Sequence, residues 1–145
     1  MAMQELGFRT VMDVTASAFF SGATWTERHW EAGRAFTQFL ERNPRIARVG
    51  FVEAHAIGPG AVQRLEDSCR AFAMLLREGY GHSRRTPPSS LALEAIVTTI
   101  FETVYDRART SRPLSLSPLL PHLTFLVLGP FIGPVEANVF IDQKV

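Results

Sequence analysis

Residues 90–110, SLALEAIVTTIFETVYDRART, decide the fold together with residues 117–129, SPLLPHLTFLVLG. In the first stretch, apolar side chains recur at helical spacing on two faces. One face holds Leu93, Ile96, Val97, Ile100 and Val104, and the other holds Thr98, Phe101, Tyr105 and Ala108. A helix that is apolar on two sides needs two neighbours to cover it.

The second stretch is predicted to begin at Ser117-Pro118, because serine is a favoured N-cap and proline is favoured at the first helical position. It is apolar nearly all round and is expected to end at Gly129-Pro130. Two such antiparallel helices from each of two subunits would form a four-helix bundle across a two-fold axis. The alternative is that one chain buries both faces itself.

The length of 145 residues is that of one domain, and residues 1–145 are interpreted as a single domain. A content of 46% hydrophobic and 20% charged residues is typical of a globular protein. The net charge of +1 argues against a strong electrostatic attraction to nucleic acid.

The single cysteine, Cys69, cannot form an intrachain disulfide and fits a reducing compartment. No secretion signal is recognisable, and the longest apolar run, near residues 119–132, is short and broken by proline. We therefore expect a cytoplasmic protein with no membrane partner.

The remaining segments also predict helices, and no stretch alternates like a strand. Helix signals cover residues 3–20, residues 24–42, residues 43–56, residues 59–79 and a short segment after Gly133-Pro134. The capping box TWTE opens the second of these ranges, and Asn43-Pro44 opens the third. A polar connection over residues 80–88 precedes the helix pair described above. The expected fold class is all-α, a bundle of about six helices.

Signatures of catalysis and metal binding are absent from the sequence. The candidate ligands His29, His55, His82, His122 and Cys69 are scattered singly, with no HExxH or Cys-x-x-Cys motif. No phosphate-binding loop and no Gly-x-Ser-x-Gly elbow occurs. We therefore expect no metal, no cofactor, no catalytic residue and no enzymatic activity.

Polar residues within the apolar helical pattern are the first candidates for a binding site. They are His29, Glu53, His55, Thr99, Glu102 and Thr103. An unpaired charge in a core is costly, so Glu53 needs a partner, a proton or water, which a cavity would supply. An ion pair with Arg48 or Arg70 is the more common solution and stays open as the alternative.

The order of helices and helix breaks resembles the C-terminal regulatory domain of the tetracycline-repressor (TetR/AcrR) family of transcription factors. Three segments carry the resemblance: residues 39–44, FLERNP; residues 52–59, VEAHAIGP; and residues 120–134, LPHLTFLVLGPFIGP. The pattern covers nearly the whole chain, and its motifs are packing and helix-break signals.

This resemblance implies an effector-binding and dimerisation domain of a transcriptional regulator, such as a repressor. Such a domain dimerises through its last long helix pair and encloses an effector pocket among its central helices. The DNA-binding helix-turn-helix module would precede residue 1, so DNA would be bound only through a domain missing from this chain.

Two sets of residues follow for the pocket and the dimer. The expected ligand-binding residues are Phe39, Glu53, Phe72, Leu76, Thr99 and Thr103, and the expected dimer interface holds Ile96, Ile100, Phe101, Leu123, Phe125 and Val127. Bulky walls with few fixed charges favour a small, largely apolar effector.

Two other functions remain open at this stage. A stand-alone dimeric interaction module, without DNA binding or a small-molecule ligand, would have a filled interior. An enzyme would use Glu53 or Glu102 as a base, and would need that carboxylate to lie in a pocket away from bulk solvent.

Overall fold

The computed structural model describes residues 2–83 and 86–145, with side chains from Leu6 onward. Within these ranges every regular element is a helix, which confirms the all-α class. The α-helices are α1 (Ala2–Ser21), α2 (Trp25–Arg42), α3 (Pro44–Ala47), α4 (Ala54–Ile57), α5 (Pro59–Arg77), α6 (Ser90–Thr110), α7 (Leu120–Ile132) and α8 (Pro134–Lys144). A π-helical segment, η1 (Arg48–Val52), and two 3-10 segments, η2 (Glu78–His82) and η3 (Ser117–Leu119), complete the described elements.

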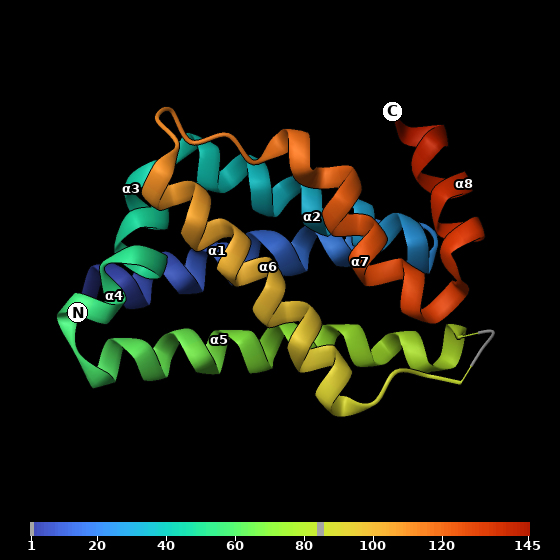
Figure 1. Cartoon of the computed structure of the whole chain (residues 1–145), viewed down its shortest axis with the longest axis horizontal. Helices are drawn as coiled ribbons and strands as arrows, with labels where there is room; N and C mark the ends of the chain where they lie inside the picture. The colour runs from blue at the N-terminus through green and yellow to red at the C-terminus, as the bar shows by residue number, and fades with distance from the viewer. Residues whose placement is uncertain (1, 84–85) are drawn as a thin grey trace.

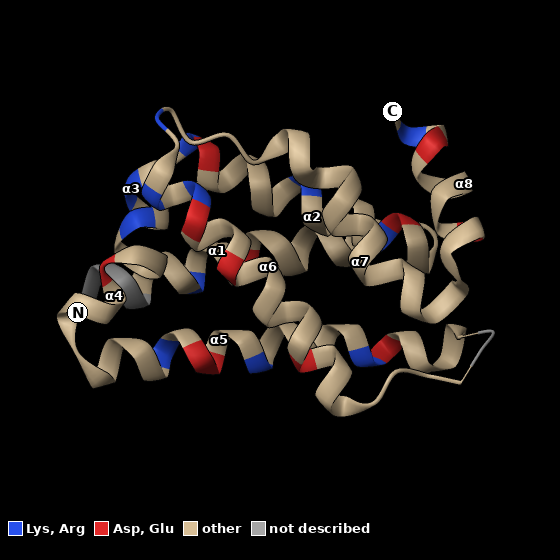
Figure 2. Ribbon diagram, viewed as in Figure 1, with Lys and Arg blue, Asp and Glu red and all other residues tan. Residues whose placement is uncertain are grey.

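Helices α1, α2 and α5 to α7 surround the interior, and α6 crosses the molecule obliquely over α5 (Figure 1). Helix α1 begins at the end where α3 and α4 lie, and α8 ends at the opposite end (Figure 1). Helix α7 contains no lysine, arginine, aspartate or glutamate (Figure 2). No helix in the described part of the chain is both long and apolar enough to cross a membrane.

The predicted start of α2 is confirmed, although only the threonine half of the capping box forms as expected. The Thr24 hydroxyl oxygen accepts a hydrogen bond from the Glu27 amide at 3.2 Å. The Glu27 carboxylate accepts one from Lys144 Nζ at 2.5 Å, which joins the start of α2 to the end of α8.

The single helix predicted over residues 43–56 is wrong, because these residues form α3, η1 and α4. Asn43 does not cap α3; its Nδ2 donates to the Phe39 carbonyl at 2.9 Å and so closes α2. The Glu53 amide donates to the Arg48 carbonyl at 2.8 Å, five residues back, which is the hydrogen bond of a π turn. This wider turn separates α3 from α4.

The predicted end of α7 at Gly129-Pro130 is also wrong, because the helix continues to Ile132. Pro130 lacks the amide that would bond the preceding turn, but the helix continues past it for two more residues. The helix stops at Gly133, whose φ of 89° is favourable only for glycine and whose amide donates to the Gly129 carbonyl at 2.8 Å.

Glu41, near the end of α2, holds the segment that leads into α7. Its carboxylate accepts hydrogen bonds from the Leu116 amide at 2.6 Å, the Ser117 amide at 2.8 Å and the Ser117 hydroxyl. Burial acts to raise the pKa of Glu41, but these hydrogen bonds outweigh it and lower the pKa. The sequence predicted that Ser117 caps the helix. Its amide and hydroxyl instead donate to Glu41.

Glu41 also explains why α6 and α7 do not form the expected closely packed pair. Helix α7 packs chiefly against α2 and α8, and α6 packs chiefly against α5 and η1, with much less contact between α6 and α7. The carboxylate fixes the start of α7 to the end of α2, while aromatic contacts hold α6 against α5.

Candidate functional site

A cavity of about 90 Å³ lies where α1, α2, α5, α6 and α7 meet. Its aromatic walls are Phe19, Phe36, Phe72 and Phe101, and its aliphatic walls include Leu76, Val97, Ile100, Leu123 and Val127. Three polar side chains, Thr15, His29 and Thr124, also line it. An apolar cavity with a few convergent polar groups is the usual form of a small-molecule site.

Contacts among three phenylalanines fix one side of the cavity. Phe72 on α5 meets Phe36 on α2 edge to face at 5.6 Å between ring centroids, and meets Phe101 on α6 at 5.4 Å. Phe36 and Phe101 are stacked at 6.5 Å. These rings tie three helices together around the cavity.

Thr15 differs from most helical threonines of this protein. The hydroxyls of Thr10, Thr37, Thr99, Thr103, Thr110 and Thr124 each donate to a backbone carbonyl four residues earlier. Thr15 Oγ1 is buried and has no hydrogen-bond partner among the described residues, although the side chain is only 4% exposed. Thr15 is therefore a cavity-lining residue whose hydroxyl makes no hydrogen bond to the described protein.

His29 is the second unpartnered polar group of the cavity. The side chain is 8% exposed and lies edge-on to Phe19 and Trp25, with ring centroids 5.1 and 4.6 Å away. No described residue bonds its Nε2. Burial, with a smaller contribution from His82, lowers the pKa of His29 to about 3, so the ring is neutral near pH 7.

This arrangement lowers the stability of the protein when no ligand is bound in the cavity. The protein leaves about 90 Å³ among these helices without a side chain of its own. Each buried polar atom without a partner costs about 1 to 3 kcal/mol. Exceptions to good packing and hydrogen bonding of this kind are expected at functional sites.

The structure brings only part of the predicted ligand-binding set to the cavity. Phe72 and Leu76 line it, whereas Phe39 packs against the core elsewhere. The hydroxyls of Thr99 and Thr103 donate to the carbonyls of Ala95 and Thr99 and do not line it.

The prediction that Glu53 lies in an apolar interior is wrong, because Glu53 is exposed. His55 and Glu102 are exposed as well, and Thr103 is half-buried. The helical spacing that suggested burial of Glu53 was disrupted by the π turn, which shifts the residues after Arg48 around the helix axis. A solvated carboxylate needs no cavity.

Residues expected at the dimer interface lie largely inside the single chain. Ile100, Phe101, Leu123 and Val127 line the cavity, and the last three of these are buried. Ile96 and Phe125 are half-buried and pack against the core. The apolar side chains expected at the interface are thus covered mostly by the protein's own helices.

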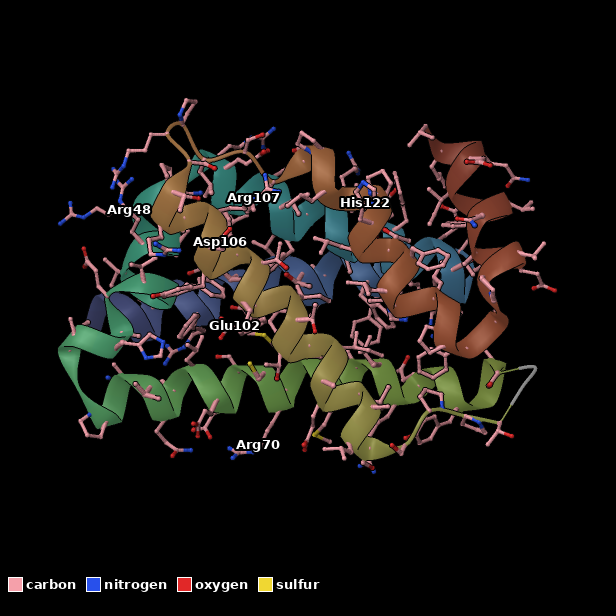
Figure 3. The ribbon with its side chains drawn as sticks, viewed as in Figure 1. Arg48, Arg70, Glu102, Asp106, Arg107 and His122 are labelled. Atoms are coloured by element: carbon pink, nitrogen blue, oxygen red, sulfur yellow. The ribbon has the colours of Figure 1, made fainter. Side chains whose placement is uncertain are left out.

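A wider, more polar groove of about 410 Å³ runs along α5, η1 and α6. Glu102 on α6 and Arg70 on α5 come from its two sides (Figure 3). Burial, followed by the carboxylates of Glu66 and Glu102, raises the pKa of Cys69 in this groove to about 11. The thiol is therefore protonated near pH 7 and is a poor nucleophile.

No group of three or more metal-ligating side chains occurs within residues 6–83 and 86–145, whose side chains the structure describes. No family model, curated protein or solved structure matches this chain.

Sequence reasoning missed Thr15, Phe19 and Thr124 as cavity residues and named His29 only as a polar exception. A signal for Thr15 was present, because it lies on the apolar stripe of α1 with Phe8, Val11 and Phe19. A hydroxyl on an otherwise apolar stripe is compatible with ordinary back-bonding to the helix, so the sequence could not distinguish the two.

Proposed function

We propose that this chain is an effector-binding and dimerisation domain of a transcriptional regulator, resembling those of TetR-like repressors. The observation that carries the proposal is the apolar cavity between five helices, which contains two buried polar atoms that no described residue bonds. The effector is small and largely apolar, because the walls supply hydrophobic area and no charged side chain. DNA binding would belong to a separate helix-turn-helix domain.

Two observations weigh against the other functions considered. A stand-alone interaction module has no need for a cavity, yet this interior has one of about 90 Å³. The carboxylates of Glu53 and Glu102 are both exposed, so neither lies in the pocket away from bulk solvent that a catalytic base would need.

Binding of an apolar molecule is the first test of this function. We expect isopentane, which has five heavy atoms, to bind the full chain and to shift NMR resonances of residues around the cavity. Ala32, which is buried and lines the cavity, provides the variant: Ala32→Leu should weaken binding at least about tenfold, because the larger side chain fills the space.

The matched control is Ala95→Leu, the same change at an exposed position of α6. It should bind isopentane like the wild type. Equal weakening by both variants, or failure of the wild type to bind either isopentane or the similar-sized isobutanol, would contradict an effector site in this cavity.

Dimerisation is the second part of the proposed function. Of the predicted interface residues, Ile96, Ile100 and Phe125 are half-buried and retain exposed apolar surface that a second subunit could cover. We expect native mass spectrometry of the full chain to detect a dimer. Ile96→Glu should shift the equilibrium to monomer, since a charge at an apolar interface is left unpaired. Leu91→Glu, on the same helix but 75% exposed in the chain, is the control. A wild-type monomer would overturn this part of the proposal.

A further inference from the structure

Thr15 and His29 are linked through Phe19 on the side of the cavity formed by α1 and α2. Both side chains line it, and they come from the adjacent helices α1 and α2. Phe19 lies one helical turn after Thr15, and its ring centroid is 5.1 Å from that of His29. Thr15 and His29 are therefore the cavity-lining residues whose buried polar atoms no described residue bonds.

We infer that the cavity selects a small neutral alcohol, whose hydroxyl hydrogen-bonds to Thr15 and His29 and whose hydrocarbon part contacts the phenylalanine walls. This inference rests on the proposed function and adds the chemical class of the ligand to it.

A hydroxyl group suits this pair better than other polar groups. Neutral imidazole nitrogen either donates or accepts, depending on the tautomer, and the threonine hydroxyl does both. An alcohol can also do both, so it pairs with either tautomer. A hydrocarbon would leave both protein groups without a partner, which disfavours it.

Charged ligands are disfavoured by the same surroundings. His29 is the only titratable side chain among the described residues that line the cavity, and its ring stays neutral near pH 7. A carboxylate or ammonium group would therefore lose its hydration without gaining an opposite charge.

Size sets the probe. The volume of about 90 Å³ is smaller than the cavity on the order of 150 Å³ known to hold benzene in another protein. Isobutanol has five heavy atoms and differs from isopentane only by a hydroxyl in place of a methyl group. The ratio of their dissociation constants therefore isolates the contribution of the hydroxyl.

The test is an NMR titration of the full chain with isobutanol and with isopentane. In Thr15→Val, which keeps the shape and removes the hydroxyl, we expect the preference for isobutanol over isopentane to fall about tenfold, equivalent to about 1.4 kcal/mol. In the wild type, isobutanol should also shift the Nε2 resonance of His29, whereas isopentane should not.

Thr124→Val is the matched control, because Thr124 lines the same cavity but already donates to the Leu120 carbonyl at 2.8 Å. Its ratio for the two probes should equal that of the wild type. An equal fall of the ratio in both variants, an unchanged ratio in Thr15→Val, or an unmoved His29 Nε2 resonance would overturn the inference. Isopentane binding in any of these cases would leave the proposed function standing, whereas binding of neither probe would overturn both.

Discussion

Phe101→Ala is expected to lower the free energy of unfolding by about 3 to 5 kcal/mol, measured by urea denaturation. Phe101 is 6% exposed and contacts Phe36, Phe51 and Phe72, with ring centroids 5.1 to 6.5 Å away. It is also the residue that lines both the cavity and the neighbouring groove. Removing its ring would leave a large void and join the two spaces.

The control is Phe20→Ala, the same substitution at a position of α1 that is 60% exposed. It should cost less than about 1 kcal/mol, because little buried area is lost. A cost below about 1 kcal/mol for Phe101→Ala as well would contradict the packing described around this ring. The joined space should also admit larger ligands, such as toluene, if the variant remains folded.

Local signals in the sequence predicted most of the helices. The capping signal at Thr24 marked the start of α2, and the periodic stretch 90–110 coincides with α6. The Gly133-Pro134 signal marked the break between α7 and α8. These features depend on capping groups and on spacing along one helix, which the sequence contains directly.

Contacts between distant segments could not be predicted in the same way. Glu41 bonds residues 116 and 117, and this link places α7 on α2 instead of beside α6. Nothing near Glu41 in the sequence distinguishes it from the other surface carboxylates of α2. The predicted helix pair, and the dimer built on it, depended on the apolar faces alone.

The cavity was predictable in kind but not in composition. The sequence indicated apolar walls, and two of the residues it named, Phe72 and Leu76, line the cavity. It also selected Glu53, which the π turn leaves exposed, and passed over Thr15. Whether a polar side chain is unpartnered depends on side chains from several helices, and a single amphipathic pattern does not contain that information.

His29 is expected to make the protein less stable in mild acid. The pKa of this histidine is about 3 in the folded protein, against an ordinary value of 6.5 in the unfolded chain. Below pH 6.5 the unfolded chain therefore binds a proton that the folded protein does not, and stability falls as the pH falls. The loss is about 1.4 kcal/mol per pH unit until the pH approaches the folded pKa, or about 2 kcal/mol between pH 7 and pH 5.

His29→Gln isolates this effect, because glutamine is polar and does not titrate. Unfolding free energies of the two proteins, measured by urea denaturation from pH 7 to pH 5, should diverge by about 2 kcal/mol, with the wild type losing more. Glu41 also has a lowered pKa, so its contribution is likewise lost as the pH falls. That loss occurs in both proteins and cancels in the difference. Parallel stability curves would mean that His29 takes up a proton in the folded state, and a protonated ring would make the cavity a site for anions instead of neutral molecules.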